Sequence, residues 1–352
     1  MQLQLASLEF CAACRSVPML HVKVEKGTPT RLWMGAPDRE TRSAKRLNAT
    51  RVPVIRARKV TWKLSASALR RMGDAFSKSK HFTFGKAYNG DVRGVAWPRD
   101  LKGLNFGESF NQPITEVHWP ASLEELLFNG DFEHPLHRVS WPVSLRSLYF
   151  TGVGQPLAGV SWPPSLRTLW FVGDVLDEPI AGITWPVSLQ NLRLGRNFNQ
   201  SIAAVNWPTS LISLRLGNRF NQAMDRVTWP KSLLVLEFGV DFNQPIVGVR
   251  WPALLMHLQF GITFNQPIAD VRWPKYLSRV TFGECFDQSV AGVAWPAMLR
   301  KLAFSRDFSL PSESFVWPAS LKSLTIPCRP NDPLPSWPGV QVSRTWEASW
   351  DS

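Results

Sequence analysis

The hydrophobic positions along this chain follow one pattern that recurs about every 22 residues. The frame is W-P-x-S-L-x-x-L-x-F-G-x-x-F-N-Q-P-I-x-x-V-x, and a clear copy occupies residues 229–250. Spacings between successive copies are 22, 22, 21 and 23 residues, and then 22 residues six times. A fixed period of this length predicts a solenoid in which each copy forms one coil. The copies begin at Trp97, Trp119, Trp141, Trp162, Trp185, Trp207, Trp229, Trp251, Trp273, Trp295 and Trp317.

Each copy contains one short stretch with the period of a β-strand. Leu236 and Phe238 alternate with Val235, Glu237 and Gly239, so one face of the strand is apolar. A single copy has too few apolar residues to form a core. Stacking places each Leu on the Leu of the next coil, and the buried face becomes continuous.

A second alternation, formed by Val249 and Trp251, predicts a short strand or an extended segment on the opposite wall. It also predicts that the tryptophans of the Trp-Pro pairs face the core, where each indole N–H needs a backbone partner. An exposed row of these rings would instead favour stacking on sugars, so a glycan-binding module stays an alternative. The prolines fix φ and lack an N–H, which suits corners between walls.

The Asn of the F-N-Q-P motif recurs at one frame position. Because a turning loop leaves backbone groups without partners, we interpret the recurring side chain as a ladder that satisfies them from coil to coil. Asp177 and Asp287 replace Asn in two copies. The ladder residues are Asn89, Asn111, Asn199, Asn221, Asn243 and Asn265.

The frame L-x-x-L-x-F-G-x-x-F-N-Q-P-I resembles the FNIP repeat, a family related to leucine-rich repeats, over about residues 82–326. The copies differ from many family members in having Trp-Pro in place of Ile-Pro. The expected fold is a mainly β, leucine-rich-repeat-like, right-handed solenoid of parallel strands with about 11–12 coils. The resemblance implies a surface that binds partners and implies no chemistry.

Four segments follow from this pattern. Residues 1–50 form a basic segment with a β-hairpin predicted over 20–34, and residues 51–80 form a cap with a strand over 60–64 and a short helix over 65–80. The solenoid occupies residues 81–326. Residues 327–352 are Pro-rich and form a carboxyl-terminal cap or tail, in which Trp337 marks a vestigial copy.

The positive charge of the chain is concentrated at its amino-terminal end. The formal net charge is +13. Residues 1–96 contain 19 Lys and Arg against six Asp and Glu, and residues 97–352 contain 21 Lys and Arg against 21 Asp and Glu. Residues 1–96 therefore offer a second class of partner, a nucleic acid or an anionic membrane, whose affinity would fall steeply with salt.

The sequence contains no phosphate-binding loop, no nucleophile elbow and no zinc-protease motif, so we expect neither an enzyme nor a cofactor. Cys11 and Cys14 form a C-x-x-C pair, but a zinc site needs a second pair. Four cysteines without clusters, no secretory signal and no long apolar run favour the cytoplasm.

One loop gathers residue types that ligate metals: Asp131, Glu133, His134 and His137. We interpret it as a polar surface loop and assign no metal.

The frame position between the buried Leu and Phe points outward from the sheet. Aromatic and Arg side chains dominate binding hot spots. Three apolar or aromatic residues at this position are followed by two arginines, and the aromatic residues fall in the copies that lose the F-N motif. Drift in a decaying stretch is the rival explanation, since aromatic residues also favour strands. We predict a non-catalytic scaffold that binds a protein partner through a patch formed by Leu127, Tyr149, Trp170, Arg193 and Arg215, with Glu125 beside it.

Overall fold

The computed structural model describes residues 60–61, 79–153, 156–173, 176–311, 315–327 and 334–344. Short strands are the regular elements of these residues, and no helix occurs among them. The strands are β1 (Val60–Thr61), β2 (His81–Thr83), β3 (Gly103–Phe106), β4 (Glu125–Phe132), β5 (Ser147–Val153), β6 (Thr168–Phe171), β7 (Asn191–Arg193), β8 (Ser213–Arg215), β9 (Val235–Glu237), β10 (His257–Gln259), β11 (Arg279–Thr281), β12 (Lys301–Ala303), β13 (Ser323–Ile326) and β14 (Gln341–Arg344).

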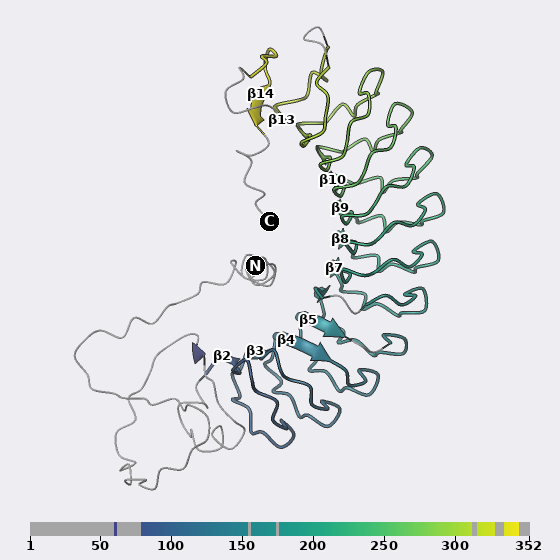
Figure 1. Cartoon of the computed structure of the whole chain (residues 1–352). Helices are drawn as coiled ribbons and strands as arrows, with labels where there is room; N and C mark the ends of the chain where they lie inside the picture. The colour runs from purple at the N-terminus through teal and green to yellow at the C-terminus, as the bar shows by residue number, and fades with distance from the viewer. Residues whose placement is uncertain are drawn as a thin grey trace, which may run out of the picture.

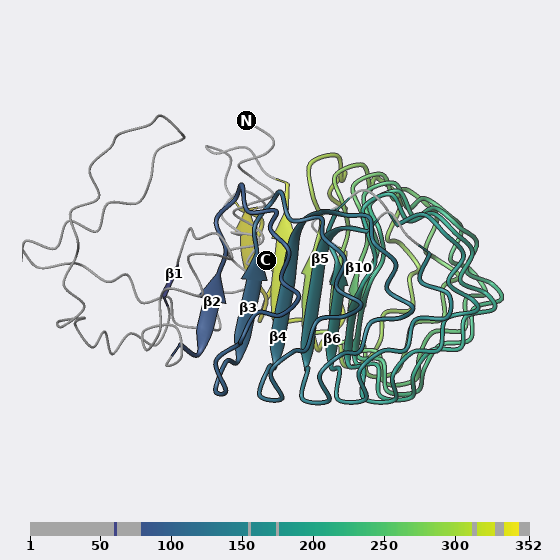
Figure 2. The same ribbon diagram turned by 90° about the horizontal axis from the view of Figure 1, so that it is seen from below.

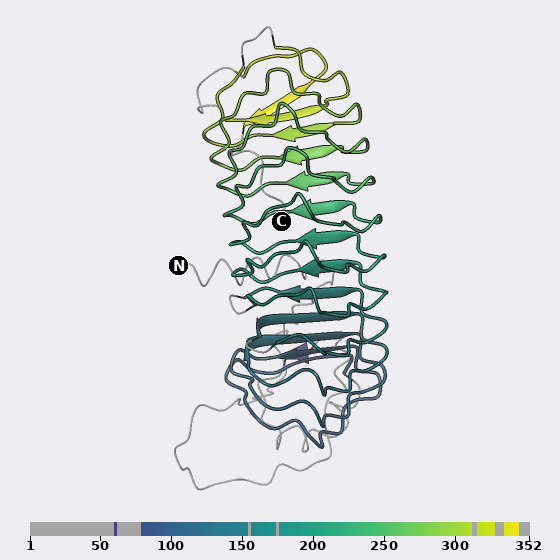
Figure 3. The ribbon, with the colours of Figure 1, turned by 90° about the vertical axis from the view of Figure 1, so that its right-hand side faces the viewer.

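All of these strands belong to one parallel sheet, and their order in space is their order along the chain (Figure 3). Equivalent frame positions pair across neighbouring coils: Leu236 in β9 is the register partner of Leu214 in β8 and of Leu258 in β10. The prediction of a parallel solenoid whose buried leucines stack is therefore confirmed.

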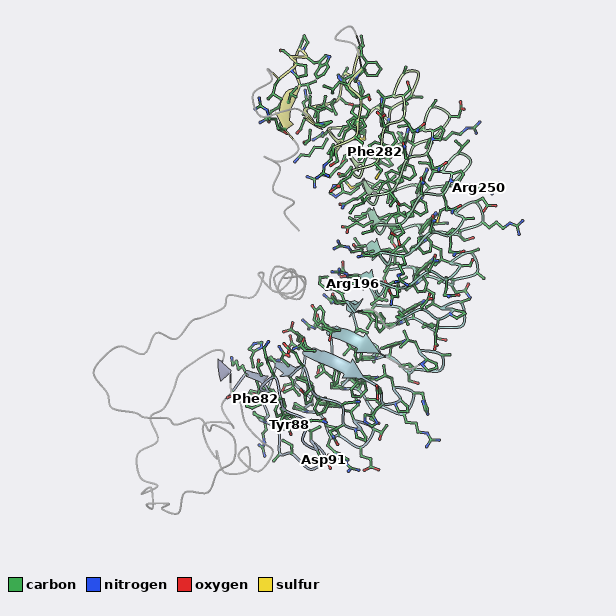
Figure 4. The ribbon with its side chains drawn as sticks, viewed as in Figure 1. Phe82, Tyr88, Asp91, Arg196, Arg250 and Phe282 are labelled. Carbon is green, nitrogen blue, oxygen red and sulfur yellow. The ribbon has the colours of Figure 1, made fainter. Side chains whose placement is uncertain are left out.

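The coils follow one another along an arc, with the strands on its concave side and the remaining walls on its convex side (Figure 1). A view from below shows β2 to β6 side by side with the same direction (Figure 2). Arg250, on the wall opposite the sheet, points away from the convex side (Figure 4). Side chains that point outward from the sheet therefore face the concavity.

Two columns of phenylalanine rings fill the core behind the sheet. Phe238, Phe260 and Phe282 stack with ring centroids 5.6 and 5.3 Å apart, and they continue the buried face of the strands. In the second column, Phe242 stacks on Phe264 at 6.0 Å. The columns touch each other, since the rings of Phe260 and Phe264 are 4.1 Å apart. Both phenylalanines of the F-G-x-x-F motif thus belong to the core.

The tryptophans of the Trp-Pro pairs pack against this core, as the alternation predicted. The prediction of a backbone partner for each indole N–H is wrong: among the described residues, the N–H groups from Trp119 to Trp337 are buried without a hydrogen bond. Stacking of identical copies brings the indoles onto one another, as for Trp273 and Trp295, whose ring centroids are 5.9 Å apart.

The wall opposite the sheet is extended and turned, and it contains no strand within the described coils. Its hydrogen bonds close tight turns: the N–H of Val249 donates to the carbonyl of Ile246 at 3.3 Å, and that of Leu255 donates to Pro252 at 3.1 Å. The alternative of a short strand around Val249 and Trp251 is therefore wrong. The prolines of Trp-Pro and Gln-Pro remove donors that a ladder on this wall would need.

The glycine after the strand motif marks the closest approach between coils. A Cβ atom built on Gly261 would lie 1.6 Å from the carbonyl oxygen of Gly239, and one on Gly283 would lie 1.8 Å from that of Gly261. Each of these glycines sits directly against the backbone of the preceding coil, so no side chain fits there.

The side chains of the Asn ladder bridge successive coils. The N–H of Asn265 donates to Oδ1 of Asn243 at 2.9 Å, and Gln266 Nε2 donates to the same oxygen at 3.0 Å. Asp177 and Asp287 accept in the same way from the N–H groups of Asn199 and Ser309. One side-chain oxygen in each of these coils thus satisfies donors of the next.

We expect Asn243→Ala to destabilise the protein by about 1–3 kcal/mol, because the half-buried N–H of Asn265 and the amide of Gln266 lose their acceptor. Asn243→Asp is the matched control. It keeps an acceptor oxygen, as Asp177 and Asp287 do, and should cost much less. Urea denaturation of both variants measures the difference, and equal losses would exclude a role of this oxygen in stability.

Short strands extend the described sheet at both of its ends. β1 pairs with β2, and β14 pairs with β13, so the sheet continues past residue 326 into the coil of Trp337. The predicted hairpin over 20–34, the body of the predicted helix over 65–80 and the pair Cys11 and Cys14 lie outside the described residues.

Candidate interaction surface on the strand face

The five residues of the predicted patch occupy one row across β4 to β8. Leu127 pairs with Tyr149, Tyr149 with Trp170, Trp170 with Arg193, and Arg193 with Arg215, without a slip in register. Parallel strands lie about 4.8 Å apart, so neighbouring members of the row touch. The row lies on the sheet that lines the concavity (Figure 1).

The aromatic part of the row is a contact pair. The rings of Tyr149 and Trp170 meet edge to face, with centroids 5.3 Å apart and planes at 86°. Both side chains are half-buried. Leu127 differs from the prediction of an outward surface residue because its side chain is only 5 % exposed. The accessible part of the row therefore begins at Tyr149.

The two arginines have different surroundings. Arg193 is half-buried beside Trp170, whereas Arg215 is exposed. Arg215 Nε lies 3.2 Å from Oε2 of Glu237, the next residue of the row in β9. This ion pair was not anticipated, although the repeat frame already places the two residues at equivalent positions in adjacent copies. It orients the Arg215 side chain along the row.

Glu125, at the start of β4, is half-buried and pairs in register with Gly103 and Ser147. Its neighbour Glu124 accepts a hydrogen bond from Lys102 Nζ at 2.6 Å. This bond, with smaller electrostatic effects of nearby cations, lowers the pKa of the Glu124 carboxyl. A charged cluster on adjacent coils therefore flanks the amino-terminal end of the row.

Two of the coils that depart from the F-N motif have longer strands, whereas β6, in a third, has four residues. β4 and β5 continue past the usual end of the strand, and their pairing resumes after an irregularity with Asp131 opposite Gly152 and Phe132 opposite Val153. The sequence predicts a polar surface loop from Asp131 onward, whereas β4 continues to Phe132. The sequence feature that could have indicated the longer strand is Phe132, whose fully buried ring stacks beside Phe110 of the previous coil.

The loop with metal-ligand residue types participates in the Asn ladder. The N–H of Glu133 donates to Oδ1 of Asn111 at 3.0 Å, and the His134 ring nitrogen Nε2 lies 3.1 Å from the carbonyl oxygen of Asn111. Across the described residues, no group of three or more His, Cys, Asp or Glu is arranged to hold a metal ion.

Within the same residues, no helix has the length and apolarity needed to cross a bilayer. Cys285 is a free thiol, half-buried in the loop after β11.

Comparison with known proteins agrees with this architecture. The chain is similar to a solved structure described as CroV588, a novel circular LRR protein, with a TM-score of 0.54 and 26 % identity over 76 % of this chain. It spans 53 % of the length of that protein. An internalin (inlF) from Listeria monocytogenes gives a TM-score of 0.41 and 14 % identity, over 75 % of this chain and 93 % of its own. No curated protein matches the chain.

The sequence profile of the FNIP Repeat matches residues 110–153, 177–219 and 198–241. These residues include β4, β5 and β7 to β9, with Leu127, Tyr149, Arg193 and Arg215 of the row, whereas β6 and Trp170 lie between two matched stretches. The chain is thus a leucine-rich-repeat-like solenoid of parallel strands that is built, over these stretches, from FNIP repeats.

Proposed function

We propose that the protein is a non-catalytic scaffold that binds a protein partner on its concave strand face. The observation that supports this proposal is the row of Tyr149, Trp170, Arg193 and Arg215, which brings two aromatic rings and two guanidinium groups into register on adjacent strands. Such side chains are over-represented among residues that dominate binding energy. The repeat architecture holds them rigidly, which lowers the entropic cost of association.

The side chains of the row suit a binding surface whose conformation is already fixed before the partner binds. Tyr and Trp bury a large apolar area with few rotatable bonds, and their edge-to-face contact fixes both rings beforehand. Arg adds a planar donor group for carboxylates and carbonyls. Glu125 and Glu124 at the end of the row would pair with cations of the partner.

Trp170→Ala combined with Arg193→Ala is expected to weaken partner binding by about 2 kcal/mol or more, which is about a thirtyfold change in Kd. Partners are captured from cell extract on the immobilised full-length chain, identified, and titrated against each variant. The fold should persist, because both side chains are half-buried on the outward face and neither belongs to the continuous core. The ring contact of Trp170 with Tyr149 contributes about 0.5–1.5 kcal/mol.

The matched control is Gln259→Ala combined with Thr281→Ala, which changes the same outward position in β10 and β11. It should leave the Kd unchanged. If the Trp170 and Arg193 variant keeps its melting temperature and still binds every captured partner at full strength, the patch is not the binding site.

A second candidate function rests on the charge of residues 1–96. We propose that this region adds affinity for a polyanion, a nucleic acid or an anionic membrane. A chain that starts at His81 should bind duplex DNA or anionic vesicles more weakly than the full chain, and the affinity of the full chain should fall steeply with salt. Equal binding by both chains would exclude this role.

A further inference from the structure

One frame position changes its chemistry in three successive coils. In seven of the eleven Trp-Pro copies it is a Ser, and in five of these the hydroxyl donates to a Leu carbonyl of the preceding coil, as Ser210 does to Leu189 and Ser232 to Leu211, both at 2.7 Å. The next three coils have large apolar side chains there, and these are 40–50 % exposed: Leu254 at 45 %, Tyr276 at 41 % and Met298 at 42 %. We call these three residues the apolar stripe.

The stripe lies at the edge where the strands begin, and cations lie beside it. Arg279 and Lys301 are the first residues of β11 and β12 and are register partners. Arg300 and Lys322 immediately precede β12 and β13, and the N–H of Lys322 donates to the carbonyl of Arg300 at 2.9 Å. All four side chains are exposed. We call these four cations the basic edge.

Within the described part of the chain, no carboxylate forms an ion pair with any of these four cations. Several other cations of the solenoid are paired, such as Lys102 with Glu124 and Arg215 with Glu237. The solenoid is neutral in sum, yet it concentrates uncompensated positive charge over three adjacent coils. A surface of this kind attracts an anionic ligand.

The pKa of His257, on the neighbouring strand β10, is sensitive to this positive charge. The pKa of its imidazole is lowered, first by burial and then by Arg279 and Lys301, while Glu237 acts weakly in the opposite direction. An acidic ligand on the basic edge would offset the two cations and raise this pKa. The side chain is therefore a built-in probe of occupancy.

We propose that the basic edge and the apolar stripe together dock an extended acidic segment of a partner protein that carries apolar side chains among its carboxylates. Charge complementarity selects the acidic residues, and the stripe selects the apolar ones. The site is separate from the row of Tyr149 to Arg215, which lies on β5 to β8, and so goes beyond the scaffold function proposed above.

Two other polyanions fit these observations less well. Thr281, Ala303 and Thr325 occupy the outward row beside the cations, and Tyr276 is the single aromatic ring of the stripe, so the site has no row of rings on which successive nucleic-acid bases could stack. A flat bilayer would not reach Arg279 and Lys301, because their strands line the concave side of the arc (Figure 1). A flexible peptide needs no row of aromatic rings, and it can enter the concave side to reach these cations.

The test uses the full chain and a labelled synthetic peptide in which Glu alternates with Leu. We expect binding by fluorescence anisotropy, and a loss of affinity of about tenfold or more in Arg300→Gln combined with Lys301→Gln. Tyr276→Ser combined with Met298→Ser should also weaken binding, and these changes restore the residue that other coils have at this position. By NMR, the pKa of His257 should rise when the peptide is bound.

Three controls make the result specific. Arg250→Gln combined with Arg272→Gln removes the same charge from exposed positions on the opposite wall and should leave the affinity unchanged. A peptide with Gln in place of every Glu should not bind. Trp170→Ala combined with Arg193→Ala should bind the peptide normally, which separates this site from the scaffold patch.

The proposal is overturned if the wild-type chain does not bind the Glu peptide at millimolar concentration, or if the Arg300 and Lys301 variant binds it equally well. It is also overturned if duplex DNA or phosphatidylserine vesicles bind more tightly than the peptide and lose that binding through the same substitutions. Thermal melting of each variant confirms that it is folded before its affinity is compared.

Discussion

Gly261→Ala is expected to destabilise the protein by about 3 kcal/mol or more, since overpacking against a rigid neighbour is costly. The new methyl group would lie 1.6 Å from the carbonyl oxygen of Gly239, and a backbone atom has no rotamer through which to move away. The two coils would have to separate, which also disturbs the phenylalanine columns behind them. Urea denaturation monitored by tryptophan fluorescence measures the loss.

Gly182→Ala is the matched control. No heavy atom lies within 4 Å of the added Cβ, and φ at Gly182 is not in the left-handed region. This substitution should be neutral or slightly stabilising, because it reduces the entropy of the unfolded chain. If the two variants have the same stability, the close approach of the coils at Gly261 is wrong.

Leu236→Ala is expected to destabilise the protein by about 2–5 kcal/mol, the range for truncating a fully buried leucine. Its side chain has no exposed surface and stacks between Leu214 and Leu258 in the adjacent strands. The cavity would interrupt the column of leucines that continues through the solenoid. Chemical denaturation gives the change in unfolding free energy.

Glu237→Ala tests the opposite face of the same strand. Glu237 lies on the concave side, and its side chain forms a partly exposed ion pair with Arg215 at 3.2 Å. Surface pairs of this kind contribute about 1 kcal/mol or less. A loss as large as that of Leu236→Ala would mean that the inward and outward faces are assigned the wrong way round.

The period of the sequence was sufficient to predict the architecture, because a solenoid has only one kind of long-range contact. A residue such as Leu236 meets the residue 22 positions away in either direction, so the frame alone gives the register. The hydrogen-bonding of Asn243 follows the same logic. Residues at the same position of the repeat frame therefore lie in one column along the solenoid.

The repeat period does not predict contacts that depend on particular neighbouring side chains or on the distance between backbones. Nothing in the frame says whether an indole N–H finds a hydrogen-bond acceptor, and the ring of Trp273 stacks on that of Trp295 while its buried N–H has none. The burial of Leu127 and the pairing of Arg215 with Glu237 depend on which side chains happen to be adjacent in the row. The role of Gly261 was invisible because it depends on the distance between backbones.

The Asn ladder has a consequence for how the molecule opens. In the copy of residues 141–161 the ladder position is Gly154, which has no side-chain oxygen to offer the next coil. Among the described residues, which leave out 154 and 155, the side-chain bridges of the ladder form one run that reaches Glu133 and another from Asp177 to Ser309. In a solenoid, where each coil contacts only its neighbours, such a break is a seam between cooperative unfolding units. Tyr149 and Trp170 lie on either side of this seam, so a partner that binds both rings would also clamp the two units together.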